Sequence, residues 1–239
     1  MSRLLVVQHE DRVPLGRITF GPLEVDVVRP DRGEPLPQRL TGHAGLVVLG
    51  GTMAAWEDDV APWLPATRAL LAACVADGTP VLGICLGAQL LALATGGRVE
   101  RGPAGPELGV VTVTATEQAA GDPLVGGLGP SWPAPQGHHD AVTELPPAAT
   151  LLASSHAYPH QAFRVGPAAW GVQYHPEATA EVLADWLESD RALLAGRGSS
   201  PEQLVAAFRG QDAALAALAR GHGEAFAAVV AARPAPVAG

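Results

Sequence analysis

One cysteine stands between two glycines in the stretch Gly83-Ile84-Cys85-Leu86-Gly87. The apolar run before it predicts a buried strand over residues 81–84, and the sequence after it predicts a helix over residues 86–95. Cys85 therefore falls at a strand-to-helix corner, where small neighbours permit the tight, strained turn that presents a nucleophile. Free N–H groups at the start of a helix favour a thiolate over a thiol. The two glycines favour a reactive thiol over the buried structural role that a single cysteine more often has.

A histidine and an acid follow a second apolar strand, in the stretch Gly171-Val172-Gln173-Tyr174-His175-Pro176-Glu177. A thiol nucleophile needs a base that takes its proton and returns it to a leaving amine. That base in turn needs an acceptor that fixes its tautomer. Pro176 favours extended geometry for the residue before it, so His175 and Glu177 can face the same way. His-Pro-Glu alone also suits a strand-end turn with a capping acid, but together with Cys85 it predicts a Cys-His-Glu triad.

The elements that position these residues alternate between strand and helix in the first half of the chain. Apolar runs predict strands over residues 4–8, 25–28, 45–49 and 81–84, and helices over residues 61–77 and 86–95. Strands that are apolar throughout and alternate with helices predict a doubly wound parallel sheet. Ligands bind at the carboxyl ends of the strands in this architecture, and Gly50, Gly51 and Cys85 all fall there.

The second half of the chain has a different pattern. Short runs rich in β-branched residues over 109–114, 150–154, 161–165 and 169–173 predict closely spaced strands that pair antiparallel. Helices are expected over residues 178–194, 201–208 and 211–232, followed by a frayed tail over residues 233–239. The alanine-rich last helix either packs on the domain or forms a surface for a partner, and the sequence leaves both open. We therefore expect an α/β sheet with helices on both faces, a small antiparallel extension and C-terminal helices.

The composition excludes several classes of protein. The chain has 239 residues, of which 48% are hydrophobic and 16% charged, as in a globular protein with a full core. Its net charge of −9 argues against nucleic acid as a partner. No apolar run reaches the ~18–20 residues of a membrane span, and the apolar region at the N-terminus is too short for a signal peptide. The two cysteines form no disulfide framework, so we expect a cytoplasmic protein.

The two motifs and the pair Gly50-Gly51 make the chain resemble a class I, triad-type glutamine amidotransferase. The resemblance is strongest to stand-alone proteins similar to the glutaminase domain of GMP synthase, and it runs from about residue 3 to about residue 187. It implies a flavodoxin-like fold. We expect an amidotransferase domain over residues 1–195 and a helical extension over residues 196–239, which packs on the same domain or faces a partner.

The resemblance implies a role for each matching residue. Cys85 would attack the side-chain amide of glutamine and form a γ-glutamyl thioester, while His175 carries the proton and Glu177 orients His175. The backbone N–H groups of Gly51 and Leu86 would hold the developing oxyanion. No metal or cofactor is needed for this half-reaction. The remaining candidates, all for substrate binding, are Gly50, Gln89, His138, His139 and Asp140.

The segment 135–142 departs from the pattern of this family, in which a Trp or Ser, a His, a small residue and an Asp line the glutamine pocket. Here Gly137 takes the first place, and His139 takes the place of the small residue. A bulkier His139 would narrow the pocket, and Gly137 removes a side chain from it. A metal site at His138, His139 and Asp140 needs three or four ligands in a closed geometry, so solvated loop residues beside the active site are the expectation.

Three hypotheses about function follow. The first is hydrolysis of glutamine, with ammonia passed to an unidentified acceptor or to a partner synthetase, since the sequence contains no phosphate-binding loop. The second is a γ-glutamyl amidase that cleaves an amine conjugate with the same triad. The third is a catalytically silent regulatory binding protein, against which the intact triad counts. Glutamine or a γ-glutamyl compound is the expected ligand, and neither nucleic acid nor a membrane is expected as a partner.

Overall fold

The first half of the chain alternates strands and helices, as its hydrophobic pattern predicts. The computed structural model of the protein describes residues 2–147 and 149–232, so the tail expected over residues 233–239 lies outside the described residues. The predicted helix over 61–77 begins three residues later, next to Pro65 in its first turn. The elements of this half are β1 (Arg3–Val7), β2 (Glu24–Val28), β3 (Gly45–Val48), α1 (Leu64–Ala76), β4 (Val81–Ile84) and α2 (Leu86–Ala94).

One nine-stranded sheet runs through the molecule in the order β2-β1-β3-β4-β11-β10-β9-β6-β7. Neighbouring strands from β2 to β11 pair in parallel, and those from β11 to β7 pair antiparallel. The later strands are β6 (Glu107–Ala115), β9 (Ala149–Ser155), β10 (Ala162–Val165) and β11 (Ala169–Val172). The predicted doubly wound sheet with an antiparallel extension is therefore confirmed. Because β11 lies beside β4, the two strands deliver the residues that follow them to the same edge.

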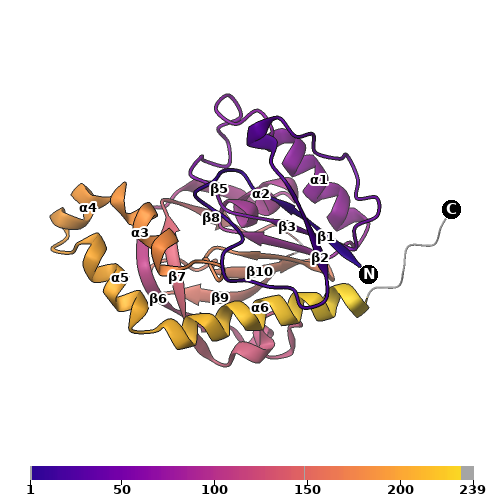
Figure 1. The fold of residues 1–239 in the computed structure, drawn as a ribbon. Coiled ribbons are helices and arrows are strands. Elements are labelled where there is room, and N and C mark those ends of the chain that lie inside the picture. The colour runs from indigo at the N-terminus through magenta and orange to yellow at the C-terminus, as the bar shows by residue number, and fades with distance from the viewer. Residues whose placement is uncertain (1, 148, 233–239) are drawn as a thin grey trace.

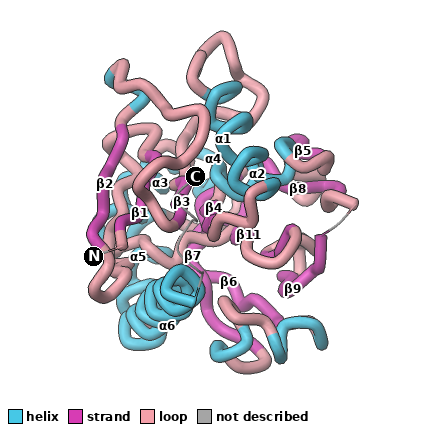
Figure 2. The backbone as a smooth tube through the Cα atoms, turned by 90° about the vertical axis from the view of Figure 1, so that its right-hand side faces the viewer, coloured by secondary structure: helices cyan, strands magenta, loops and turns pink. Residues whose placement is uncertain are grey.

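Helices cover both faces of this sheet (Figures 1 and 2). Side chains alternate along a strand, so Leu5 and Val7 of β1 join the core under α1 and α2, whereas Leu4 and Val6 join the core under α6 (Asp212–Ala232). The last helix thus packs on the sheet, which the sequence had left open. No helix among the described residues combines the length and apolar character needed to cross a bilayer.

The sequence missed three strands, all close to the predicted pocket segment. These are β5 (Arg98–Arg101), β7 (Ser131–His138) and β8 (Asp140–Glu144). β5 and β8 form a separate two-stranded sheet, and β7 is the last strand of the main sheet. Pro133 and Pro135 lie within β7, and a proline, which lacks an N–H group, is tolerated in a strand at a sheet edge. The expectation that residues 138–140 belong to a solvated loop was therefore wrong.

The helix predicted over residues 178–194 is two helices in the structure. They are α3 (Ala180–Glu188) and α4 (Arg191–Gly196), which Ser189 and Asp190 separate. The N–H of Asp190 donates to the carbonyl oxygen of Leu187, three residues back, so the regular helical ladder ends there. Together with α5 (Pro201–Arg209), these helices pack around Leu183, Leu187 and Phe208 at one end of the sheet. Three short 3₁₀ turns complete the elements, at Pro30–Arg32, Glu117–Gly121 and Gly126–Leu128.

Candidate active site

Cys85 occupies the corner between β4 and α2 with a backbone conformation that L-residues seldom adopt. Its φ is 50° and its ψ is −106°, and it is the only non-glycine with positive φ among the described residues. Its N–H donates to the carbonyl oxygen of Val172 at 2.8 Å, which ties the corner to β11. Such strain persists only where the surroundings impose it, and it is typical of functional sites.

The two glycines beside Cys85 have a steric role. A Cβ atom on Gly83 would lie 2.5 Å from the carbonyl oxygen of Gly87, and one on Gly87 would lie 2.0 Å from the carbonyl oxygen of Val48. Both distances are far below a normal contact, and both involve backbone atoms that have no rotamer with which to escape. The glycines thus allow α2 to begin directly against the ends of β3 and β4.

His175 and Glu177 follow β11, the strand that pairs with β4. His175 Nδ1 lies 2.7 Å from Glu177 Oε1, and both side chains are buried, with 3% and 1% exposed. Burial disfavours the charged imidazole, but the Glu177 carboxylate and the Cys85 sulfur outweigh it and raise the pKa of His175 to about 10. His175 therefore carries a proton at neutral pH and holds it next to the sulfur.

The Gly50-Gly51 pair lies between the ring and the thiol. A Cβ atom on Gly50 would lie 2.9 Å from His175 Cε1 and 3.6 Å from Cys85 Cβ, so these two side chains flank the same point. Gly51 lines the cavity that contains Cys85. Leu86 is the first residue of α2, and its N–H has no acceptor within the helix. The backbone thus places the two N–H groups predicted for the oxyanion on either side of Cys85.

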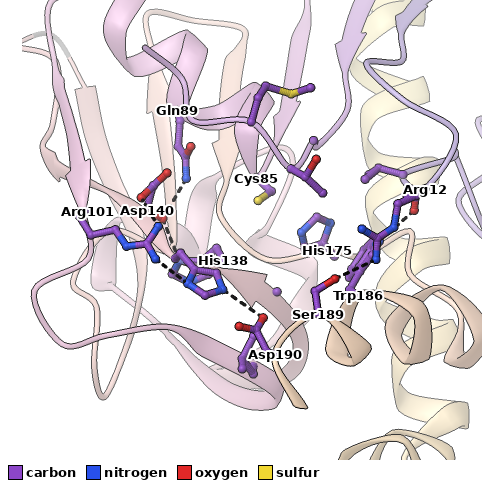
Figure 3. Close-up of a pocket in the computed structure, with 17 residues that line it drawn as sticks. Arg12, Cys85, Gln89, Arg101, His138, Asp140, His175, Trp186, Ser189 and Asp190 are labelled. Atoms are coloured by element: carbon purple, nitrogen blue, oxygen red, sulfur yellow. Dashed lines mark hydrogen bonds and ion pairs between the residues drawn. The ribbon is translucent and has the colours of Figure 1, made fainter. Parts of the chain in front are cut away.

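A cavity of about 400 Å³ opens over these residues (Figure 3). Its volume lies within the ~300–1,000 Å³ typical of small-molecule sites. Gln89 of α2 and the segment 137–140 line it on one side of Cys85, and His175, Trp186 and Arg12 line it on the other. The predicted residues Cys85, Gly51, Gln89, His138, His139, Asp140 and His175 all line this cavity, whereas Gly50, Leu86 and Glu177 lie behind its wall.

His138 faces the protein with both ring nitrogens. Nδ1 lies 2.9 Å from the carbonyl oxygen of Asp140, and Nε2 lies 3.0 Å from Glu107 Oε2. The same Glu107 carboxylate accepts hydrogen bonds from Ser155 and Gln161, in a buried network behind the cavity. His138 therefore shapes the backbone turn at Asp140, and both of its polar atoms are already engaged within the protein.

His139, the residue that departs from the family pattern, bridges two parts of the cavity rim. Its Nδ1 accepts from Arg101 Nη2 at 3.0 Å, so its Nε2 carries the proton and donates to Asp190 Oδ2 at 3.0 Å. Arg101 also donates to Asp140 at 3.4 Å. Burial raises the pKa of Asp140, and Arg101 partly opposes this. Among the described residues, these side chains belong to no group of three or more potential metal ligands.

Gly137, the second departure, makes room for a tryptophan of α3. A Cβ atom on Gly137 would lie 3.0 Å from Trp186 Cε3. The Trp186 ring lies 4.4 Å from the His175 ring, centroid to centroid, and its Nε1 donates to the carbonyl oxygen of Arg12 at 2.9 Å. Both departures thus accommodate the segment 185–190, because Gly137 admits Trp186 and His139 binds Asp190.

Several residues at the site were not found from the sequence. Arg12 donates to Asp185 at 2.6 Å and to Ser189 at 3.3 Å, and it closes the cavity beside Trp186. Gln173 donates through Nε2 to Cys85 Sγ at 3.5 Å. Only Gln173 had a local signal, since it lies in the predicted His-Pro-Glu stretch, two residues before His175. The other two come from segments whose approach to the cavity no local pattern indicates.

Comparison with known proteins supports the resemblance. The family model described as "Glutamine amidotransferase class-I" matches residues 19–190. A GMP synthase of Aeropyrum pernix is 33% identical over 211 residues, which cover 83% of this chain and 38% of that enzyme. Gamma-glutamyl peptidase 4 of Arabidopsis thaliana is 32% identical over 166 residues, or 68% of this chain and 64% of that protein. The chain thus spans less than two thirds of the length of either relative.

The fold has a solved counterpart of similar size. The crystal structure of a glutamine amidotransferase from Thermotoga maritima superimposes with a TM-score of 0.82 and 28% identity. The superposition covers 95% of this chain and 98% of that one, so it includes the C-terminal helices. The described architecture, from β1 to α6, is thus shared with that protein as a whole.

Proposed function

The chain belongs to the class I glutamine amidotransferases, and from this premise we propose that it hydrolyses the side-chain amide of glutamine with Cys85, His175 and Glu177 as its triad. The observation that carries the proposal is the strained corner at Cys85, which faces the same cavity as His175. The 2.7 Å contact between His175 Nδ1 and Glu177 leaves Nε2 as the nitrogen that can serve the thiol.

In the first step, the Cys85 sulfur attacks the amide carbon of glutamine and forms a tetrahedral adduct. The N–H groups of Gly51 and Leu86 receive the negative charge that develops on the carbonyl oxygen, an interaction whose loss costs ~10²–10³ in rate in other enzymes. His175 gives its Nε2 proton to the amide nitrogen, and ammonia leaves. The C–N bond is broken, and a γ-glutamyl thioester on Cys85 remains.

In the second step, water attacks the thioester and His175 takes its proton. The C–S bond breaks, glutamate leaves, and the sulfur and the imidazolium are restored. Glu177 holds the imidazole in one tautomer and stabilises its charge through both steps. The raised pKa of His175 suits this role, because the ring is protonated when the leaving amine needs a proton.

The substrate's α-amino and α-carboxylate groups are assigned to the side of the cavity opposite His175. The Asp140 carboxylate offers an acceptor for the ammonium group, and Arg101 beside it offers a donor for the carboxylate. Gln89 lines the same side. His138 and His139 act on the shape of this subsite, since the ring nitrogens of both already bind protein groups. Gly50 contributes space beside His175.

We propose further that the ammonia goes to a partner. The relatives include an undivided GMP synthase and, in Ignicoccus hospitalis, a protein named as one glutamine-hydrolysing part of a GMP synthase made of separate chains. A synthetase that aminates an activated acceptor is therefore the class of partner to expect. The structure offers no acceptor-activating residues at the described cavity. We place the proposed amidotransferase domain at residues 1–195, with the helices after residue 196 packed on it through α6.

The test is release of ammonia and glutamate from L-glutamine, measured with the wild type and with Cys85→Ser, each with and without candidate synthetase partners. We expect turnover in the wild type and none in Cys85→Ser. A glutamine-like electrophile that labels Cys85 would report the thioester step separately. If neither turnover nor labelling is seen under any of these conditions, the chain is catalytically silent and the proposal is wrong.

A second candidate function is cleavage of a γ-glutamyl amine conjugate. The observation that favours it is the extent of the cavity beyond His175, onto Trp186, Arg12 and Ser189. Ammonia needs no such space, whereas a larger amine leaving group would lie there. Chromatographic assay of a series of γ-glutamyl amides tests this candidate. Rates that exceed the rate with glutamine, and that fall in Trp186→Ala, would establish it, and rates below that with glutamine would refute it.

A further inference from the structure

A row of hydrogen bonds links the substrate side of the cavity to the sulfur of Cys85. Gln89 Nε2 donates to the carbonyl oxygen of Asp140 at 2.9 Å and to Gln173 Oε1 at 3.3 Å. Gln173 Nε2 then donates to Cys85 Sγ at 3.5 Å. Both glutamine residues are buried, with 3% and 2% exposed. The proposed reaction steps make no use of Gln173.

The carbonyl oxygen of Asp140 sets the direction of the whole row. A carbonyl oxygen can only accept, so Gln89 must turn its NH₂ group toward it. The same NH₂ group also faces Gln173, which must therefore present its oxygen to Gln89 and its own NH₂ group to the sulfur. If the amide of Gln173 were flipped, two NH₂ groups would face each other and an oxygen would face the sulfur. The donor at the sulfur thus follows from the chemistry of its neighbours.

We propose that Gln173 is a catalytic residue whose side-chain N–H stabilises the thiolate of Cys85 and holds the sulfur in place, and that Gln89 is the positioning residue that aims it. The inference rests on the proposed role of Cys85 as the nucleophile. A hydrogen bond to a charged acceptor is about twice as strong as one between neutral groups. The N–H therefore favours the thiolate over the thiol, and the proton that leaves the sulfur resides on His175. Burial strengthens the effect, because water does not compete for the donor.

The charged groups around the sulfur do not depend on Gln173. His175, paired with Glu177, lies beside Cys85, and the other charged or titratable side chains of the cavity are Arg12, Arg101, His138, His139, Asp140 and Asp190. None of the hydrogen bonds of these side chains described above involves the side chain of Gln173. A substitution of Gln173 that changes the thiol therefore reports the direct N–H contact.

Alkylation of the thiol by iodoacetamide, followed by intact mass at a series of pH values, tests the proposal without any need for turnover. Cys85→Ser supplies the background from Cys74, which is buried in α1. We expect Gln173→Met to slow alkylation at neutral pH about tenfold and to move the ultraviolet absorbance of the thiolate to higher pH. Gln173→Glu should slow it further, because a carboxylate then faces the sulfur. Gln89→Met should slow it less, and should add nothing in the Gln173→Met background.

Tyr174→Phe is the matched control. Tyr174 follows Gln173 directly, but its hydroxyl hydrogen-bonds His222 of α6 at 3.0 Å, so the variant loses a buried hydrogen bond away from the sulfur. It should alkylate at the wild-type rate. The proposal is wrong if Gln173→Met and Gln173→Glu both keep the wild-type rate and absorbance profile, even where glutamine turnover falls. If instead the wild type turns over no γ-glutamyl compound but Gln173→Met still alkylates slowly, the proposed function fails and this inference stands.

Discussion

Replacing Cys85 with glycine should stabilise the protein relative to replacing it with alanine, although both variants lose activity. At φ 50° and ψ −106°, any side chain with a Cβ atom is strained, and glycine is not. A residue held in a sparsely populated region costs ~1–3 kcal/mol. Against this, glycine loses ~0.5–1 kcal/mol through the greater freedom of its unfolded chain. We therefore expect the glycine variant to be more stable than the alanine variant by about 1 kcal/mol.

The assay is urea denaturation of both variants, with the slopes compared so that a shift of midpoint reports stability. For a chain of this length, 1 kcal/mol also corresponds to a difference of about 2–4 °C in Tm. Ala92→Gly in the regular part of α2 is the control, where the same loss of a methyl group should destabilise by at least ~1 kcal/mol. The opposite signs at the two positions are the signature of stored strain.

The reasoning fails if Cys85→Gly is less stable than Cys85→Ala by the ordinary ~0.5–1 kcal/mol, because the corner would then hold no strain at the nucleophile. Equal stabilities would mean that strain and chain entropy cancel, and would place the strain below the range assumed here. In either case, the proposal that the fold spends stability to present the thiol would have to be abandoned.

Three further predictions address the surroundings of the site. Gly137→Ala should lower glutamine turnover and destabilise by about 1 kcal/mol by pushing Trp186 against His175; the effect should shrink in a Trp186→Leu background, and equal costs in both backgrounds would contradict the contact. Burial lowers the pKa of His222 from 6.5 to about 4, so the unfolded chain takes up a proton that the native state does not. Stability from this group is complete above pH 6.5 and falls by about 3 kcal/mol toward pH 4, and His222→Gln, compared by urea denaturation at both ends, should lose that share of the pH dependence. Asp122→Ala should destabilise by ~3–5 kcal/mol, since it strands the buried Trp170 N–H and the Arg164 guanidinium, and a melt close to that of the wild type would show that water replaces the carboxylate.

Much of the fold could be predicted because its signals are local. The apolar runs of β1, β3 and β4 each stand in one short stretch, and their predicted bounds agree with the structure within a residue or two. The strands that were missed carry other signals. β7 contains two prolines, and β5 reads Arg-Val-Glu-Arg, so neither matches the pattern of a buried strand. The break between α3 and α4 was missed because helix-forming residues continue through it.

The sequence by itself determined the corner at Cys85, its flanking glycines and the pairing of His175 with Glu177. Each of these is set by neighbours one or two positions away, where φ/ψ sterics and side-chain reach act directly. Only the tertiary structure decided what surrounds them. His139 meets Asp190 across 51 residues, and Gln173 meets Cys85 across 88. Contacts of that range depend on how β4, β11 and α3 pack, and a glycine at 137 acquires its meaning only once Trp186 is placed against it.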